Sequence, residues 1–560
     1  MQRCSSEKLV INVVDYWIFF FGLSSFKSYY RYKHGYWSRR GIRGPKPYLI
    51  VGNLFEELVK NRPLLWRNWI KQYGQVMGTY SGVKPILLVA DAELIKNILV
   101  KDAHVFPNRM HFDYLDKNTY NMLFFMRDAR WKSLRSLLAF TMTSGKIKRL
   151  FPLMMESGDE LMGAVGKQAK KSHGNNLLDT KTVYGCYTMD VIARSSFAAR
   201  FDSKNSDQKH RTELVTFLMN NLSEFSFPRI AIAIMIPKMI LEAIGFSING
   251  GHVDRRLTTV VQSIIDSRRK LGPKSRRDDM LQLLLDLDAS KGIGEHMLET
   301  TTGDESESHH VASADKEEIK EVLEHGKKSS AVVAANHGPK SDDHEAKMKL
   351  TDNEIIGNCQ LFIIAGYDTT SSLLSFFTHT LAHHPEAQQK LYEEIKTAFP
   401  SGVFNYETVT RLSYLDACIS EVLRLFPPLG HIDREANDDY RIDSLNLRIP
   451  KDGAIVIPIY AIHRDEKYYE QPDSFIPERF LPENRHKLTP YTYLPFGAGI
   501  RHCLGMRFAL AEAKLALARL IFSYKFTPAP GHDFPPKLEL STALLKSNGL
   551  KVNVHPRTCT

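Results

Sequence analysis

The sequence predicts a mainly α-helical fold with small β-sheets. Most of the periodic apolar stretches in its 560 residues repeat at helical spacing, as they do within residues 355–364 and 506–522. Residues 84–90 form a short, continuous apolar run that predicts a strand. A hydrophobic content of 43% and an aromatic content of 10% allow one large core or two ordinary ones. Length alone therefore leaves the number of domains open.

The positive charge of the chain is concentrated near its start. The net charge is +11, and one segment without acidic residues carries seven basic ones: Lys27, Arg31, Lys33, Arg39, Arg40, Arg43 and Lys46. The rest of the chain is only mildly basic, whereas a nucleic-acid-binding protein would concentrate its basic residues on a binding face. A basic cluster beside an apolar segment is typical of a membrane-flanking sequence, so we expect no nucleic-acid partner.

The chain is expected to have three parts. Residues 1–26 contain an apolar run from Leu9 to Phe26 without a small-residue cleavage site, which predicts a retained membrane anchor. Because this run is short and carries Asn12 and Asp15, a spanning helix and an interfacial helix both remain open. Residues 27–46, followed by Pro47, predict a basic, proline-containing hinge, and residues 47–560 the catalytic domain. The positive-inside rule then keeps that domain in the cytosol.

Residues 286–350 are predicted to be a disordered insertion. They contain no Phe, Trp or Tyr and are rich in charged residues, Ser and His, so they cannot bury enough apolar surface to offset the entropy of ordering. The pair His309 and His310 could suggest a metal site, but a solvated linker is the better interpretation. The six cysteines are spread singly, which favours a reducing compartment and argues against a disulfide scaffold.

Two later helices have clear ends. Thr351 and Glu354 form a capping box that begins an apolar helix running through Asp368 and Thr369. A second helix carries Glu421 and Arg424 and is stopped by the prolines at 427–428.

The segment that carries the chemistry is residues 496–505, FGAGIRHCLG. Two glycines before Cys503 and one after it let the backbone approach a flat cofactor, and a helix that starts just beyond the sulfur favours the thiolate. An ordinary buried cysteine is the usual alternative for a lone Cys. The segment resembles the haem-binding signature of cytochrome P450 enzymes, Phe-x-x-Gly-x-Arg-x-Cys-x-Gly, at every fixed position, which outweighs that alternative.

The resemblance implies a fold with haem b held between two long helices and with Cys503 as the iron ligand. It assigns Phe496 to the cofactor site and pairs Arg501 with a haem propionate. Trp131 and Arg135 match the family's Trp-x-x-x-Arg and reach the propionates from one helix face. Similarity to the microsomal clan that contains drug- and steroid-oxidising enzymes and thromboxane synthase adds two further propionate partners, Arg109 and Arg434.

The same resemblance assigns three further roles. Glu421, Arg424 and Arg479 form a structural triad that supports the haem-binding loop. Thr369 acts in oxygen activation, and Asp368 relays protons from solvent. Gly366, which is unfavourable inside a helix, suits a groove in which dioxygen and water lie against the backbone.

The resemblance implies a monooxygenase that inserts one atom of dioxygen into a hydrophobic lipid, sterol or xenobiotic. Because no nucleotide-phosphate loop is recognisable, NADPH-derived electrons must come from a partner, which the resemblance implies is the microsomal diflavin reductase, with cytochrome b5 as a possible second partner. Localisation at the endoplasmic reticulum membrane follows from the same resemblance. Candidate substrate contacts are Phe124, Phe125 and residues 217–227 and 429–432, and residues 230–237 are a candidate lipid contact. A lipid-peroxide isomerase or dehydratase and a non-catalytic haem sensor remain alternatives.

Overall fold

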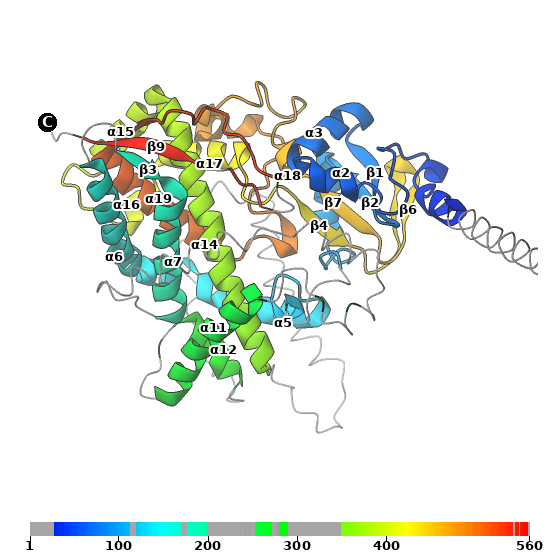
Figure 1. The fold of residues 1–560 in the computed structure, drawn as a ribbon, viewed down its shortest axis with the longest axis horizontal. Helices are drawn as coiled ribbons and strands as arrows, with labels where there is room; N and C mark the ends of the chain where they lie inside the picture. Colours follow the sequence, from blue (N-terminus) through cyan, green and yellow to red (C-terminus); the bar gives the residue numbers. More distant parts are fainter. Residues whose placement is uncertain are drawn as a thin grey trace, which may run out of the picture.

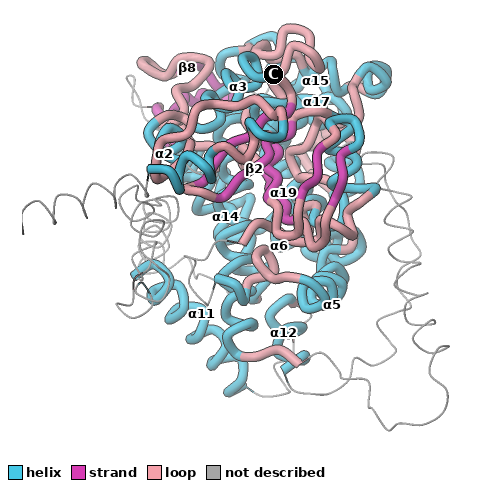
Figure 2. Tube along the Cα trace, turned by 90° about the vertical axis from the view of Figure 1, so that its right-hand side faces the viewer, coloured by secondary structure: helices cyan, strands magenta, loops and turns pink. Residues whose placement is uncertain are grey.

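The computed structural model describes residues 27–111, 119–170, 176–198, 241, 246, 252–271, 277, 279–288, 349–540, 544–547 and 549–557. Helices form most of this part of the chain, and small sheets lie at its edges (Figures 1 and 2). The predicted fold class, mainly α with small sheets, is confirmed.

The helical part lies on the left of Figure 1 and the largest sheet on the right. The helices are α2 (Leu54–Val59), α3 (Arg62–Tyr73), α4 (Ala92–Lys96), α5 (Asp128–Ala139), α6 (Ser144–Ala169), α7 (Thr180–Phe197), α11 (His252–Leu271), α12 (Met280–Asp288), α14 (Asp352–His383), α15 (Pro385–Ala398), α16 (Tyr406–Thr410), α17 (Ser413–Leu425), α18 (Ile459–Ile462) and α19 (Met506–Ser523).

Helix α14 organises the helical part. It contacts α7, α11, α12, α15, α17 and α19, and the side chains from Thr370 to Ala382 are all buried. Its start is the predicted capping box, because the Thr351 hydroxyl accepts from the Glu354 backbone N–H at 3.3 Å and a Glu354 carboxylate oxygen accepts from the Thr351 N–H at 2.8 Å. A helix of 32 residues crosses the whole core and can therefore present different faces to different partners.

Three sheets accompany the helices. The strands are β1 (Val76–Ser81), β2 (Lys84–Val89), β3 (Leu177–Asp179), β4 (Ile432–Glu435), β5 (Tyr440–Ile442), β6 (Leu447–Ile449), β7 (Ala454–Ile457), β8 (Tyr524–Pro528) and β9 (Lys551–Pro556). The largest sheet has the order β1-β2-β7-β4, with β2 parallel to β7 and the other two pairs antiparallel, while β3-β9-β8 and β5-β6 are antiparallel. The strand predicted at residues 84–90 is confirmed as β2.

The packed body begins earlier than residue 47. Trp37 is buried, and its indole N–H donates to the Thr79 carbonyl at 3.0 Å, while the Tyr80 hydroxyl donates to the His34 carbonyl at 2.5 Å. A Cβ on Gly78 would collide with the Trp37 side chain, so the glycine allows this close approach. His34 and Trp37, within the segment 27–46, therefore pack on β1, and the hinge assigned to this segment stays a prediction.

Several predicted segments lie outside the described residues. They are the anchor at 1–26, residues 217–227 and 230–237, and most of the insertion, including His309 and His310. Helix α12 extends to Asp288, three residues into the segment predicted as an insertion, and the chain is described again from Lys349, whose carbonyl accepts from Arg130 at 2.7 Å. Within the described ranges, no helix combines the length and the apolar character that crossing a membrane requires.

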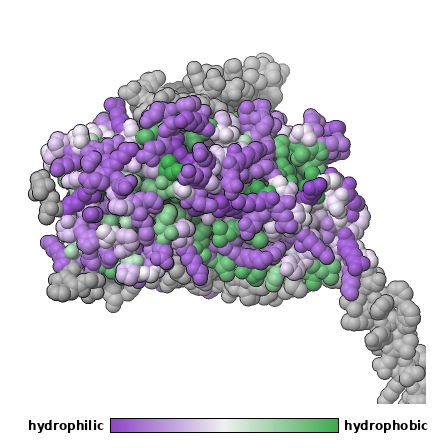
Figure 3. Space-filling model, turned by 90° about the horizontal axis from the view of Figure 1, so that it is seen from above, coloured by the Kyte–Doolittle hydropathy of each residue, from purple (hydrophilic) through white to green (hydrophobic). Residues whose placement is uncertain are grey.

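The surface is mostly polar on the face seen in Figure 3, with apolar patches between charged side chains. Several of the exposed large apolar side chains fall within residues 48–64: Tyr48, Leu49, Phe55, Val59 and Leu64. This short stretch follows the basic segment 27–46 directly in the chain.

A buried ion pair ties α17 to the chain that follows it. Glu421 and Arg424 are fully buried and form a bidentate pair at 2.7 and 2.8 Å. Arg424 also donates to the carbonyls of His463, Pro472 and Ser474. A surface location, the alternative for a Glu and an Arg three residues apart, is thus excluded.

The predicted third member of the triad, Arg479 of the 3-10 helix Pro477–Phe480, lies at 3.5 Å from the Glu421 carboxylate. Glu421 also accepts from the Ile476 backbone N–H at 2.9 Å. One carboxylate therefore joins two arginines and a backbone amide from two separate stretches of chain.

Replacing Glu421 with Ala is expected to lower the free energy of unfolding by about 3–5 kcal/mol, because Arg424 would remain buried without its counter-charge. Urea unfolding followed by circular dichroism measures this change. The matched control is Asp439→Ala, which removes the exposed ion pair with Arg448 and should leave the unfolding midpoint unchanged. Equal midpoints for Glu421→Ala and the control would contradict a stabilising role for the buried pair.

Candidate functional site

The loop before α19 presents Cys503 through a tight turn. Gly497 and Gly499 have φ angles of 73° and 66°, in the left-handed region that favours glycine. A Cβ on Gly499 would also collide with the Leu99 carbonyl. The Cys503 backbone N–H donates to the Phe496 carbonyl at 2.8 Å, which closes the turn. Helix α19 begins three residues after Cys503, as the sequence predicts.

Cys503 has an exposed side chain, whereas Cys186 is half-buried and Cys359 and Cys418 are buried. Protein atoms nevertheless crowd around the sulfur, since desolvation raises the pKa of the Cys503 thiol, while the Gly505 N–H and the charges of Arg135 and Arg109 oppose this rise. Both observations agree if the sulfur opens into a recess inside the protein rather than onto its outer surface. A Cβ on Gly505 would meet no protein atom within 4 Å, so the space beside Gly505, two residues after Cys503, is also open.

Four arginines gather near Cys503. Arg109, Arg135, Arg434 and Arg501 come from four separate stretches of chain, and Arg434 and Arg501 are 2% and 5% exposed. Burial lowers the pKa of Arg434 and of Arg501, and repulsion from the neighbouring guanidinium groups lowers both further. The carboxylate that offsets part of this charge is Asp433, 3.8 Å from Arg109. Positive charge is therefore in excess at this place.

Two donors of these arginines have no partner in the described part of the chain, the Arg501 Nη1 and the Arg109 Nε. The other donors of Arg501 are fixed, since Nε donates to the Pro107 carbonyl at 2.7 Å and Nη2 to the Met126 carbonyl at 2.8 Å. Buried unpaired donors beside excess positive charge suit an anionic ligand. A flat group with two carboxylates and an iron atom for the sulfur, which is haem, fits this set of donors.

Trp131 and Arg135 lie on one face of α5, as their spacing predicts. The centre of the Arg135 guanidinium is 5.9 Å from the Trp131 ring, and that of Arg501 is 3.7 Å from the same ring. Arg135 also donates to the His502 carbonyl, next to Cys503, at 2.7 Å. The structure thus brings together the cysteine and the six other residues that the sequence proposes for the cofactor.

Thr369 lies on a face of α14 that is not covered by the rest of the described chain. Ala365 is exposed, and Leu361 and Thr369, four residues before and after it, are half-buried although most of the helix is buried. The Thr369 hydroxyl donates to the Ala365 carbonyl at 2.6 Å. The exposure at intervals of four residues indicates that one continuous face of this helix is left uncovered.

Gly366 is half-buried, and one side of it packs closely on α7, while the groove predicted beside its backbone stays a prediction. A Cβ at this position would collide with the side chain of Ile192 on α7. The glycine therefore allows α14 and α7 to pack closely, which explains its presence in a helix interior.

Asp368 faces α7. Its carboxylate pairs with the Lys181 ammonium at 2.7 Å, and Lys181 also donates to the hydroxyls of Ser371 and Ser372. Burial alone would raise the pKa of Asp368, but the charges of Lys181 and Lys546 and the hydrogen bond from Lys181 together outweigh burial and lower the pKa below its ordinary value. Asp368 and Thr369 are thus neighbours in sequence with separate surroundings. Sequence reasoning missed Lys181, because nothing near it in the chain indicates a partner 187 residues away.

His463 was also missed, and it connects the triad to the cysteine loop. Burial lowers its pKa to about 3, so the ring is neutral. It lies 3.1 Å from the Arg424 carbonyl through Nδ1, and its Nε2 accepts from the Leu494 backbone N–H at 2.8 Å. Leu494 in turn accepts from the Gly497 N–H at 3.0 Å. The fully buried Arg424 is therefore linked by hydrogen bonds to the turn that presents Cys503.

The candidate substrate contacts are only partly described. Phe124 and Phe125 are half-buried and in edge-to-face contact, and the Arg109 guanidinium lies 3.7 Å from the Phe124 ring. In residues 429–432, His431 packs edge-to-face on Trp66 and Ile432 begins β4. Phe124 thus lies beside Arg109, and the geometry of these side chains does not identify a substrate.

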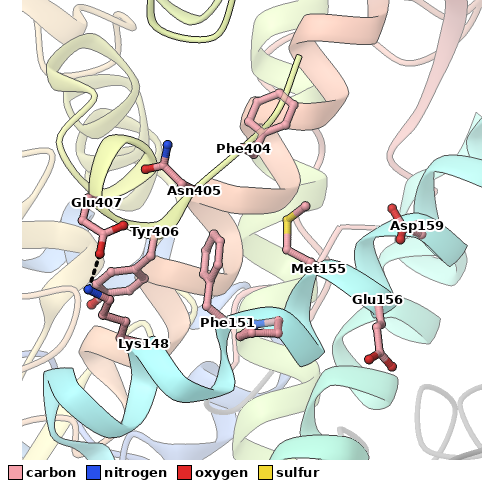
Figure 4. Close-up of a pocket in the computed structure, with 10 residues that line it drawn as sticks. Lys148, Phe151, Met155, Glu156, Asp159, Phe404, Asn405, Tyr406 and Glu407 are labelled. Carbon is pink, nitrogen blue, oxygen red and sulfur yellow. Dashed lines mark ion pairs between the residues drawn. The ribbon is translucent and has the colours of Figure 1, made fainter. Parts of the chain in front are cut away.

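A separate cavity of about 550 Å³ lies between α6 and the chain that leads into α16 (Figure 4). Phe151, Met155, Phe404 and Tyr406 provide its apolar walls, and Lys148 and Glu407 form an ion pair at its edge. None of the residues proposed for the cofactor or for catalysis lines this cavity.

Comparisons with known proteins agree with this geometry. The cytochrome P450 family model matches residues 42–305 and 306–554. Cytochrome P450 3A6 of Oryctolagus cuniculus is 34% identical over 90% of this chain and 89% of its own length. Cytochrome P450 3A7 of Homo sapiens is 34% identical over 94% and 93%, and cytochrome P450 3A29 of Sus scrofa is 32% identical over 94% of each chain. Because the match spans nearly the whole chain and includes the loop that presents Cys503, this protein belongs to the cytochrome P450 family and is a haem-thiolate monooxygenase.

Proposed function

We propose that this enzyme inserts one oxygen atom into a hydrophobic lipid, sterol or xenobiotic, with Cys503 as the thiolate ligand of haem b. The single observation that carries the site assignment is the accumulation of four guanidinium groups beside an exposed cysteine in a recess. When bound, the haem supplies an iron centre at which dioxygen is reduced.

The residues around the recess would hold the cofactor by charge and by shape. Arg501 and Arg109 each offer a buried donor without a partner, and Arg135 and Arg434 add positive charge for the two carboxylates. The Trp131 ring keeps the Arg501 guanidinium in place from one side. Phe496 fixes the turn through its carbonyl, so the Cys503 sulfur keeps its direction.

Electrons would come from NADPH through the microsomal diflavin reductase, with cytochrome b5 as a second donor. The glycine-rich stretch 497–505 is a turn before α19 and not a dinucleotide loop, which supports a separate electron donor. The basic segment 27–46 and the exposed apolar residues within 48–64 support attachment to the endoplasmic reticulum membrane, with the catalytic domain in the cytosol.

Thr369 and Asp368 would handle protons. The Thr369 hydroxyl lies on the open face of α14 and exchanges its bond to the Ala365 carbonyl for a bond into the recess. Asp368 is ionised at neutral pH because Lys181 and Lys546 stabilise its charge, and to relay a proton toward Thr369 its carboxylate would leave the ion pair with Lys181. Lys181 controls how easily the carboxylate leaves its ion pair.

Replacing Cys503 with Ala is expected to abolish the thiolate-ligated haem, since no other residue of the turn offers a soft anionic ligand. The carbon-monoxide difference spectrum of the reduced protein measures this loss. Cys186→Ala, on α7, is the control and should keep the wild-type spectrum. A wild-type Soret band in Cys503→Ala would contradict the ligand assignment.

Replacing Thr369 with Ala is expected to retain haem and substrate binding but to reduce product formation about 100-fold, the lower range for a positioned proton-transfer group. The electrons would appear instead as hydrogen peroxide. Hydrogen peroxide and product per NADPH are measured with reductase, and Thr369→Ser should restore most of the coupling. Unchanged coupling in Thr369→Ala would remove Thr369 from the mechanism.

Replacing Lys181 with Met is expected to lower the free energy of unfolding by about 3 kcal/mol at pH 7, because Asp368 would stay buried and unpaired. The folded-state pKa of Asp368 is depressed, so the stability from this pair is present above the unfolded-state pKa of about 4 and is lost as pH falls below it. Urea unfolding at pH 7, 5, 4 and 3 should therefore show a difference between variant and wild type that is nearly constant down to pH 4 and smaller at pH 3. A difference that is independent of pH would contradict the ion-pair explanation.

A further inference from the structure

The side chain of Asn108 is fully buried and uses its whole hydrogen-bonding capacity. Its Nδ2 donates to the carboxylate of Asp128 at 2.7 Å and to Asn437 Oδ1 at 2.9 Å. Its Oδ1 accepts from the Asp128 backbone N–H at 3.0 Å and from Arg501 Nη2 at 3.3 Å. An amide has two donor and two acceptor positions, so this arrangement fixes the orientation of the side chain completely.

Asn108 holds the start of α5. Asp128, the first residue of this helix, has a φ of 52°, a left-handed conformation that is unfavourable for a residue with a side chain. The two hydrogen bonds between Asn108 and Asp128 compensate for this strain. Because α5 begins there, they also set the direction in which the helix presents Trp131 and Arg135.

Asn108 also reaches the other arginines. The Arg501 group that it contacts stacks on Trp131 at 3.7 Å. The backbone carbonyl of Asn108 accepts from the Glu435 N–H at 3.0 Å, at the end of β4. Arg434 directly precedes Glu435 in the chain, and Arg109 directly follows Asn108. One neutral amide therefore joins the four stretches that carry the arginines.

The chemical type of residue 108 matters as well as its position. An amide orients Arg501 without adding a negative charge, so the excess positive charge remains available for an external anion. An aspartate of the same shape would pair with Arg501 and would place a second carboxylate against Asp128, which is unfavourable.

We propose that Asn108 is a positioning residue that arranges Arg501, Trp131 and Arg135 to receive the two carboxylates of the cofactor, an inference that rests on the haem site proposed above. Its effect is specific to the anionic edge of the cofactor. It follows that Asn108 should control how strongly the protein distinguishes haem from haem whose propionates are uncharged.

The experiment compares iron protoporphyrin IX with its dimethyl ester, which lacks the two negative charges. The rate of cofactor loss to an acceptor protein is followed by absorbance for both groups, without measuring turnover. In the wild type the ester should leave faster than haem. In Asn108→Ala, haem should leave roughly tenfold faster while the ester changes little, because a hydrogen bond to a charged group is worth about this factor.

Two further variants make the outcome decisive. Gln388→Ala removes another buried amide, one that bonds to the backbone of Leu381 and Phe526 and not to any of the four arginines, and it should keep the wild-type discrimination between haem and the ester. Asn108→Asp keeps the shape of the side chain and replaces Asn108→Ala in the experiment if that variant does not fold. It should also lose the discrimination between haem and the dimethyl ester.

Equal acceleration for haem and ester in the Asn108 variants, or no acceleration, would overturn the proposal. A wild type that binds haem without the thiolate spectrum would instead refute the haem site itself, so the two failures are distinguishable.

Discussion

The buried pair of Arg424 and Glu421 supports the turn that presents the cysteine. Arg424 saturates its guanidinium with one carboxylate and three backbone carbonyls, all inside the protein. His463 extends this network to Leu494, whose carbonyl accepts from the first glycine of the turn. Since a buried charge is stable only with its partners in place, the network has a single arrangement, and the position of Cys503 depends on it.

The arginines near Cys503 form a cluster whose charge, unlike that of Arg424, is not compensated. Around Arg501, like charges gather without enough carboxylates to neutralise them, and buried donors are left without protein partners. This arrangement is unfavourable in the protein alone, and a dianionic cofactor would reverse the balance. The network around Arg424, whose charge is compensated, thus contributes to stability. The adjacent cluster around Arg501, whose positive charge is in excess, would contribute to cofactor affinity.

Two faces of helix α14 have different surroundings. Thr369 and Ala365 lie on the open side, whereas Asp368 turns to Lys181 and Gly366 packs against Ile192 on α7. A helical pitch of 3.6 residues places consecutive residues about 100° apart, so neighbours in sequence necessarily point to different surroundings. The proton transfer proposed for Asp368 and Thr369 would therefore have to link the closed side of the helix to the open side.

The sequence by itself determined the fold class, the capping box at Thr351, the strand at residues 84–89 and the motif around Cys503. Each of these depends on residue types within about ten positions, because helix starts, strands and tight turns are local. The tertiary structure alone decided that Lys181 faces Asp368, that His463 supports the loop, that Asn108 touches Arg501 and that Gly366 serves packing. These contacts join residues that lie 31 to 393 positions apart, or depend on which neighbouring helix a glycine faces, and no local pattern encodes such distances. Only the packing of distant segments into one core brings these groups together.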